Sequence, residues 1–154
     1  MESLTFNVAG LNILISQCDY EKVIKHKWYK INSGKKYPTI AFYERNKNIR
    51  LHRFIMDCPS GLFIDHVNGN TLDNRRENLR ICTKAENNRN RCINKNNKSG
   101  FKGVSWDKKT SKWRAFVYKN GKSIYCGLFI TPEEAHKAYY EASKKYYGEF
   151  VRAE

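Results

Sequence analysis

Four side chains near the middle of the chain have the types and the spacing that hydrolysis of a phosphodiester bond would require. Asp65 and His66 are adjacent, Asn78 follows His66 by twelve positions, and Asn87 follows Asn78 by nine. Such hydrolysis needs a base that activates water and a divalent cation that stabilises charge on the phosphate and the leaving oxygen. A hard cation such as Mg²⁺ prefers oxygen ligands and keeps several waters, so one carboxylate and one amide oxygen suffice. Asp65 and Asn87 are therefore candidate metal ligands, and His66 is the candidate base.

The elements around these side chains must bring them together. The run Leu62–His66 predicts a strand that carries Asp65, and Leu79–Cys82 predicts a second short strand. The capping box T-K-A-E then predicts a helix from about Lys84 to Ile93. A strand–loop–strand–helix unit folds its helix back across the first strand, which would place Asn87 beside Asp65.

The loop between the two strands is rich in turn-forming residues. Because side chains alternate along a strand, His66 should point away from the side that Asp65 occupies. It could then act as a base without competing for the metal. We assign the small polar residues of the loop to turn formation: Asn68, Gly69, Asn70 and Asn74.

The run LHRFIMDCPSGLFIDHVNGNTLDNRRENLRICTKAENNRNR resembles the motif of HNH (ββα-metal) endonucleases, in the form found in phage and intron-encoded nucleases. The resemblance covers roughly residues 50–92. It implies that Asp65 and Asn87 bind the divalent metal, that His66 is the general base and that Asn78 braces the loop carrying His66. Asparagine in place of histidine at the last position favours Mg²⁺ or Mn²⁺ over softer ions. The neighbouring Asn88 is an alternative ligand.

Basic residues flank this motif. His52 and Arg53 precede it as the His-Arg pair of the family does, and Arg89 and Arg91 follow Asn87. We predict that all four lie at the DNA. For Arg53 the alternative is a solvated surface charge.

The C-terminal third predicts three antiparallel strands and one helix. Asn120-Gly121 is a strong signal for a hairpin turn. Thr131 should cap the helix, with Pro132 at its first position, and Gly148 should end it. The three strands are predicted near Gly103–Asp107, Trp113–Lys119 and Lys122–Phe129.

Residues 99–150 resemble the ethylene-response-factor (apetala-type) DNA-binding domain of plants. The shared features are FKGV, the run W-R-A at 113–115, the run C-G-L-F at 126–129, and an alanine-rich helix. In that family the three-stranded sheet enters the major groove of DNA. Several positions that contact DNA in the plant proteins carry other residues here. The resemblance therefore does not imply the plant target sequence. Strand alternation puts Arg114 and Tyr118 on one face and Trp113 on the other. The predicted DNA-facing residues are Lys102, Trp106, Arg114, Tyr118, Lys122 and Tyr125.

The N-terminal region is strand-rich. Residues 4–16 predict two short strands and a turn, and Asp19 predicts a capped helix to about Trp28. Strand-like patterns recur at Tyr37–Tyr43 and Ile49–Ile55. The predicted fold class is α+β. It comprises an endonuclease domain over residues 1–93, a polar linker at 94–99 and a DNA-binding domain at 100–154.

The net charge of +14 is spread along the chain: the basic excess is +5, +4 and +5 over residues 1–64, 65–98 and 99–154. Such a spread is typical of a protein that lies along a polyanion, here double-stranded DNA. No apolar run is long enough for a bilayer, no signal-peptide pattern is present, and the five scattered cysteines indicate a reducing, intracellular setting. We expect a monomer.

Two other classes of protein and one other metal site are alternatives. A non-catalytic, sequence-specific DNA-binding regulator would use the nuclease motif as a scaffold only, but such a module needs no base beside a metal ligand. An RNA-binding protein is compatible with the charge, although neither motif favours it. A zinc site formed by Cys58, Cys82 and Cys92 would require a spacing that these residues do not have.

Overall fold

The computed structural model describes residues 2–31, 38–91, 93–94 and 96–151, and the chain folds into two compact units, Met1–Asn88 and Arg89–Glu154. Small antiparallel sheets and short helices make up most of both, which confirms the α+β class. The predicted linker at 94–99 falls within the second unit. No helix among the described residues is long and apolar enough to cross a membrane.

The first unit begins with the predicted hairpin. Strands β1 (Ser3–Val8) and β2 (Leu11–Ser16) pair in antiparallel register across a tight turn at Ala9 and Gly10, both of positive φ. The short strand β7 (Asp73–Asn74) joins β2 in parallel. A residue pair from the middle of the chain is thereby fixed to the N-terminal hairpin.

The helix predicted from Asp19 to Trp28 is much shorter. A 3₁₀ turn, η1 (Gln17–Asp19), leads into α1 (Tyr20–Val23), and the Asp19 side chain makes no cap hydrogen bond. Its carboxylate, 1% exposed, instead accepts two hydrogen bonds from the Arg76 guanidinium at 2.8 and 2.7 Å. A buried carboxylate requires such a partner, and this requirement outweighs the capping preference.

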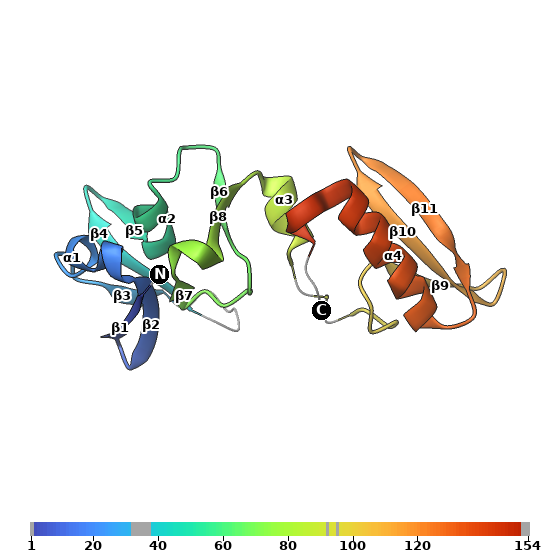
Figure 1. The fold of residues 1–154 in the computed structure, drawn as a ribbon, viewed down its shortest axis with the longest axis horizontal. Helices are drawn as coiled ribbons and strands as arrows, with labels where there is room; N and C mark the ends of the chain where they lie inside the picture. Colours follow the sequence, from blue (N-terminus) through green and yellow to red (C-terminus); the bar gives the residue numbers. More distant parts are fainter. Residues whose placement is uncertain (1, 32–37, 92, 95, 152–154) are drawn as a thin grey trace. The chain divides into compact units, whose positions relative to one another are not determined.

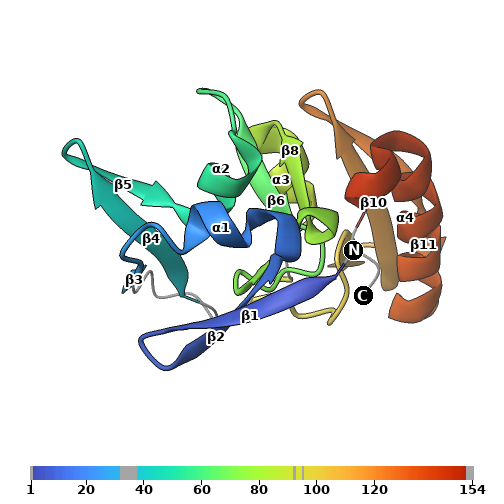
Figure 2. The same cartoon turned by 60° about the vertical axis from the view of Figure 1, so that its left-hand side comes forward.

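A second sheet contains β3 (Tyr29–Ile31), β4 (Thr39–Glu44) and β5 (Lys47–Arg50), and Tyr37 of the predicted strand lies outside the described residues. The strand predicted over Ile49–Ile55 is wrong beyond Arg50, because Leu51–Met56 form helix α2. Leu51 and Ile55, four residues apart, are both buried, which is helical spacing. Figures 1 and 2 show α2 beside the β4–β5 hairpin.

The motif itself folds as strand, loop, strand and helix. Strand β6 (Phe63–His66) pairs with β8 (Leu79–Cys82), and a 3₁₀ turn, η2 (Arg76–Asn78), precedes β8. Helix α3 (Lys84–Arg89) follows, and the predicted capping box is present between Thr83 and Glu86. The helix ends at Arg89, before the predicted Ile93, and none of its residues is buried.

Most helices and strands of the first unit contribute side chains to its hydrophobic core. Side chains of both hairpins, α1, α2, β6 and β8 meet in it: Val8, Ile13, Ile15, Val23, Ile40, Leu51, Ile55, Ile64 and Leu79. Ile64 and Leu79 anchor the β6–β8 pair to this core. The polar residues at the ends of the two strands are therefore held on a packed support.

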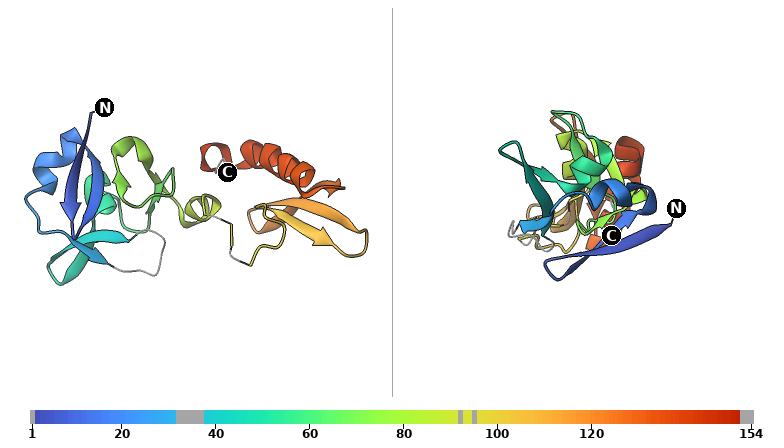
Figure 3. Two further views of the ribbon diagram at one scale, coloured as in Figure 1. Left: turned by 90° about the horizontal axis from the view of Figure 1, so that it is seen from below. Right: turned by 90° about the vertical axis from the view of Figure 1, so that its left-hand side faces the viewer.

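The second unit confirms the predicted three strands and helix. Strands β9 (Val104–Asp107), β10 (Lys112–Lys119) and β11 (Lys122–Phe129) form a sheet in the order β11-β10-β9. Helix α4 (Pro132–Tyr147) begins with the predicted cap at Thr131, which forms a capping box with Glu134, and it is followed by η3 (Gly148–Phe150). It covers one face of the sheet (Figures 1 and 3).

The core of the second unit lies between α4 and that face. It consists of Val104, Ala115, Val117, Ala135 and Tyr139, with Trp113 and Phe129 packed against them. The opposite face carries no helix of this unit, as Figure 3 shows. One face of the sheet therefore builds the core, and the other remains open.

Candidate active site and DNA-binding surface

Asp65 and His66 end strand β6 and are both buried, at 5% and 7% exposure. The Asp65 carboxylate does not stand alone. Arg80, directly opposite on β8, donates to its Oδ2 from Nε at 2.9 Å and from Nη2 at 2.6 Å. The candidate metal ligand is therefore half of a buried ion pair.

His66 lies among polar and aromatic neighbours that fix its ring. Its Nε2 is 3.4 Å from Asn74 Oδ1, and the His52 ring meets it edge-on at 5.2 Å between centroids. If Nε2 carries the proton, Nε2–H donates to Asn74, and Nδ1 keeps the lone pair that a base needs. His52, predicted to lie at DNA, is thus a neighbour of the candidate base.

The prediction that Asn74 is a turn residue is wrong. Asn74 is 1% exposed, lies on β7 and pairs with Ile15 of the N-terminal hairpin. Its side chain donates to the Thr71 carbonyl at 3.1 Å in addition to contacting His66. The other three residues do form turns: Asn68 and Asn70 accept main-chain hydrogen bonds two residues ahead, and Gly69 has φ +72°.

Asn78 joins the two ends of the loop that follows His66. Its Oδ1 accepts from the Asn68 main-chain amide at 3.0 Å, and its Nδ2 donates to the Asp73 carbonyl at 2.7 Å. Its own carbonyl accepts from the Val67 amide at 2.9 Å. These are the hydrogen bonds that a loop-bracing residue would make.

A second ion pair stiffens the same loop. Asp73, 2% exposed, accepts from Arg75 Nε and Nη2 at 2.8 Å each and from Asn68 at 2.9 Å. The hydrogen bonds from Arg75 hold the pKa of the Asp73 carboxyl below its usual value. Asp73 therefore stays ionised and keeps the loop closed.

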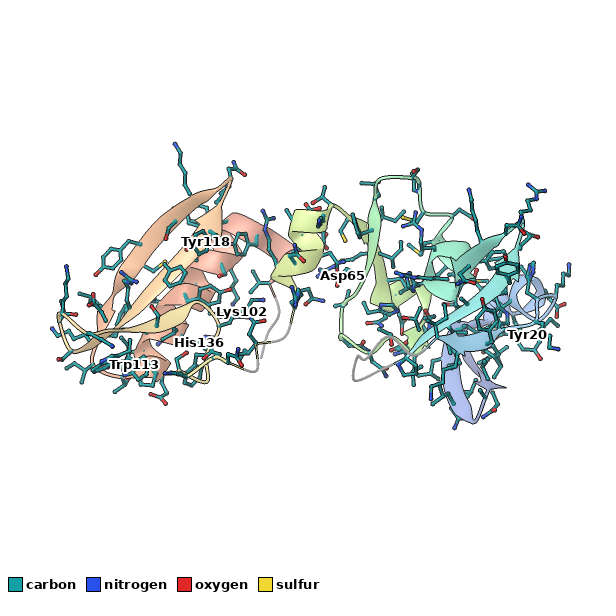
Figure 4. The ribbon with its side chains drawn as sticks, turned by 180° about the vertical axis from the view of Figure 1, so that it is seen from behind. Tyr20, Asp65, Lys102, Trp113, Tyr118 and His136 are labelled. Atoms are coloured by element: carbon teal, nitrogen blue, oxygen red, sulfur yellow. The ribbon has the colours of Figure 1, made fainter. Side chains whose placement is uncertain are left out.

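Asn87 lies in α3 and is partly buried. In Figures 1 to 3 this helix lies beside the β6–β8 pair, and Figure 4 shows Asp65 on the side of β6 that faces α3. Among the described residues no group of three or more His, Cys, Asp or Glu could hold a metal ion. A carboxylate and an amide still fit Mg²⁺, which takes oxygen ligands and completes its shell with water and phosphate oxygens.

The alternative zinc site has little support from Cys82, which is buried. Burial raises the pKa of the Cys82 thiol to about 11, and its Sγ–H donates to the Phe63 carbonyl at 3.6 Å. Cys82 therefore packs as a protonated thiol. Cys92 lies outside the described residues.

Arg53, which was predicted to contact phosphate, donates its hydrogen bonds to main-chain carbonyls of the protein itself. Its Nη1 donates to the Leu62 carbonyl at 2.7 Å, and its Nη2 donates to the Cys58 and Pro59 carbonyls at 2.9 and 3.0 Å. It thus closes the turn that leads into β6. A phosphate contact of its remaining N–H groups stays a prediction.

In the second unit, Arg89 and Lys102 also have intramolecular partners. The Lys102 ammonium donates to the carbonyls of Arg89 and Arg91, the latter at 2.9 Å. The Arg89 guanidinium lies over the Tyr147 ring, 4.5 Å from its centroid. The predicted DNA contacts of Arg89, Arg91 and Lys102 stay predictions.

The structure separates the predicted DNA-facing residues of the sheet into two groups. Arg114, Tyr118 and Tyr125 are exposed on the open face, where Tyr125 pairs with Phe116. By contrast, Trp106 pairs with Trp113, their rings 5.0 Å apart, and Lys122 pairs with Lys119. Strand alternation places these two pairs on the same face as α4, where Trp106 and Lys122 are nevertheless exposed.

The sequence analysis did not assign Arg80 or Asn74 to the site. Arg80 could have been found, because pairing the two predicted strands places a basic residue opposite Asp65. Asn74 had no such signal, since its position depends on a parallel pairing with β2, almost sixty residues earlier. The short sequence D-N is typical of a turn in any other context.

The sequence matches two known families. The pattern of the HNH endonuclease family matches residues 57–89, and that of the AP2 domain matches residues 99–149. These two ranges contain β6 to α3 and β9 to α4, respectively. No solved structure matches the chain.

Three relatives come from viruses or a prophage. The uncharacterized HNH endonuclease L560 of Acanthamoeba polyphaga mimivirus is 34% identical over 148 residues, 92% of this chain and 74% of the relative. Protein 3.8 of Escherichia phage T7 is 44% identical over 42% of this chain and 53% of its own length. YosQ of Bacillus subtilis, named as a candidate SPbeta prophage HNH homing endonuclease, is 44% identical over 27% of each chain. The chain thus belongs to the HNH endonuclease family and is a DNA endonuclease that carries an AP2 domain behind its HNH motif.

Proposed function

We propose that this endonuclease is metal-dependent and site-preferring, of the homing type, and that it acts on duplex DNA. His66 accepts the proton of the attacking water, and Asn74 and Asn78 hold the ring and its loop in place. The observation that carries this proposal is the buried His66 ring, 3.4 Å from Asn74 and next to Asp65 on a strand anchored to the core. Buried polar neighbours keep such a base oriented before the substrate arrives.

Asp65 and Asn87 would bind the divalent metal, Mg²⁺ or Mn²⁺. Such an ion supplies Lewis-acid stabilisation of the charge that develops on the phosphate and the departing oxygen. The chain's own contribution is to orient the carboxylate through Arg80 and to hold the His66 ring against Asn74. Asp65 and His66 are neighbours on strand β6.

Incubation of the full chain with supercoiled plasmid tests this proposal. We expect cleavage in the presence of Mg²⁺ or Mn²⁺ and none with EDTA. Because one chain has one such site, nicked circles should accumulate before linear DNA. The measurement is the time course of the three plasmid forms on a gel. Equal cleavage with EDTA would contradict the metal dependence.

We further propose that the AP2 domain positions the enzyme through the open face of its sheet. A guanidinium on this face can bind guanine or phosphate with two hydrogen bonds. Arg114→Ala should therefore weaken specific DNA binding by about 1–3 kcal/mol and leave the melting temperature nearly unchanged, because Arg114 is exposed. The affinity is measured by titration of a preferred duplex, once selection has identified one.

Trp113→Ala is the matched variant on the opposite face. Trp113 packs against the core and against the Trp106 ring, so its loss should lower the free energy of unfolding by about 3 kcal/mol. A destabilised Arg114 variant beside a stable, binding-deficient Trp113 variant would mean that DNA binds the other face.

A further inference from the structure

All three buried aspartates among the described residues are paired with arginine. Asp19 accepts from Arg76, Asp73 accepts from Arg75, and Asp65 accepts from Arg80. The Asp19–Arg76 pair joins segments 57 positions apart, and the Asp73–Arg75 pair stiffens the loop that follows His66. The third involves the carboxylate that the proposed function assigns to the metal.

The Arg80 pair removes the negative charge on which a divalent cation would depend. Both partners are shielded from water, with side-chain exposures of 6% for Asp65 and 14% for Arg80. At 2.6 Å the guanidinium neutralises the carboxylate, and it would repel a second cation through a medium that screens poorly. His66 and Asn87 add no negative charge.

The acidic residue next to Asn87 in the sequence, Glu86, is held by hydrogen bonds at the cap of α3. Glu86 Oε2 accepts hydrogen bonds from the main-chain amide and the hydroxyl of Thr83, both at 2.8 Å. The Glu86 carboxylate therefore caps the N-terminus of α3. The Asp65–Arg80 pair therefore offers a divalent cation oxygen atoms but little net attraction, and a DNA phosphate would supply the missing negative charge.

We propose that the divalent cation and the duplex enter this site together, and that Arg80 is the positioning residue that imposes this dependence. The inference rests on the proposed function of Asp65. Arg80 holds the carboxylate in one orientation in the free protein, and it prevents tight binding of metal until a phosphate is present. An enzyme built in this way holds no tightly bound metal between encounters with DNA.

Binding of Mn²⁺ to the full chain, followed by electron paramagnetic resonance of the free ion, tests the proposal without any cleavage. The DNA-free protein should bind Mn²⁺ only weakly, whereas its complex with a short duplex should hold one ion beyond those that the duplex binds alone. Arg80→Gln should bind Mn²⁺ without DNA about tenfold or more tightly than the unaltered chain, because the carboxylate loses its cation.

Two variants serve as controls. Arg80→Lys keeps the charge and should bind Mn²⁺ as weakly as the unaltered protein. Arg75→Gln breaks the neighbouring Arg–Asp pair and should leave Mn²⁺ binding unchanged. Melting curves show which variants fold. If Arg80→Gln does not fold, the comparison of the unaltered chain with and without duplex still decides the question.

Tight binding of Mn²⁺ by the DNA-free chain, or no change in a folded Arg80→Gln variant, would overturn the inference. Plasmid cleavage distinguishes this failure from failure of the proposed function. Cleavage with Mn²⁺ by a protein that binds Mn²⁺ tightly on its own would leave the function standing. The absence of cleavage under every condition would reject the function, and the inference with it.

Discussion

Replacement of His66 by alanine should lower the rate of DNA cleavage by about 10²–10⁴-fold, which is the range that a positioned general base contributes. The ring lies at the end of β6, with Asn74 at Nε2 and His52 edge-on, so its removal deletes the base without touching the sheet register. DNA affinity should change little. The measurements are single-turnover cleavage of plasmid and titration of the same DNA.

His26→Phe is the matched control in the same unit. His26 lies among the rings of Phe42 and Phe54, at 4.1 and 4.8 Å between centroids, and phenylalanine preserves those contacts. This variant should cleave like the unaltered enzyme. Cleavage at the normal rate by His66→Ala would reject His66 as the base.

Gly103→Ala should destabilise the second unit more than any other single-methyl addition at its glycines. Gly103 has φ +71°, and a Cβ there would lie 2.1 Å from Cδ2 of Tyr139, which is 8% exposed in the core. The backbone conformation alone costs alanine about 1–2 kcal/mol, and overpacking adds roughly 1–3 kcal/mol. The expected loss in the free energy of unfolding is therefore about 2–5 kcal/mol, measured by denaturant titration.

Gly121→Ala separates the two contributions. Gly121 also has a positive φ, +77°, but a Cβ there would meet nothing within 4 Å. It should lose only the backbone contribution. Equal losses for the two variants would mean that α4 shifts freely to accommodate the methyl group, and that the close approach of Tyr139 is not required.

The second unit was predictable because its signals are local. The N-G turn, with φ of +52° and +77° at Asn120 and Gly121, sets the pairing of β10 and β11 from the turn to Phe116, where the register shifts. The cap at Thr131 and the glycine at 148 fix the ends of α4. Each of these preferences acts over a few residues and agrees with the tertiary structure.

The N-terminal region was less predictable because its local signals compete with long-range ones. The pattern Ile49–Ile55 fits both a strand and a helix, and only burial of Leu51 and Ile55 against the core selects the helix from Leu51 onward. Asp19 has a capping residue's chemistry but is drawn into an ion pair with Arg76, 57 positions later.

The sequence by itself determined the family and the identity of the catalytic candidates, because Asp65, His66, Asn78 and Asn87 keep fixed spacings within one short unit. Only the tertiary structure decided which groups surround them. Arg80 neutralises Asp65 across a strand pair, and Asn74 reaches His66 through its pairing with β2. The physical reason is that a buried polar group must find a partner, and chain folding, not sequence proximity, determines which partner is within reach.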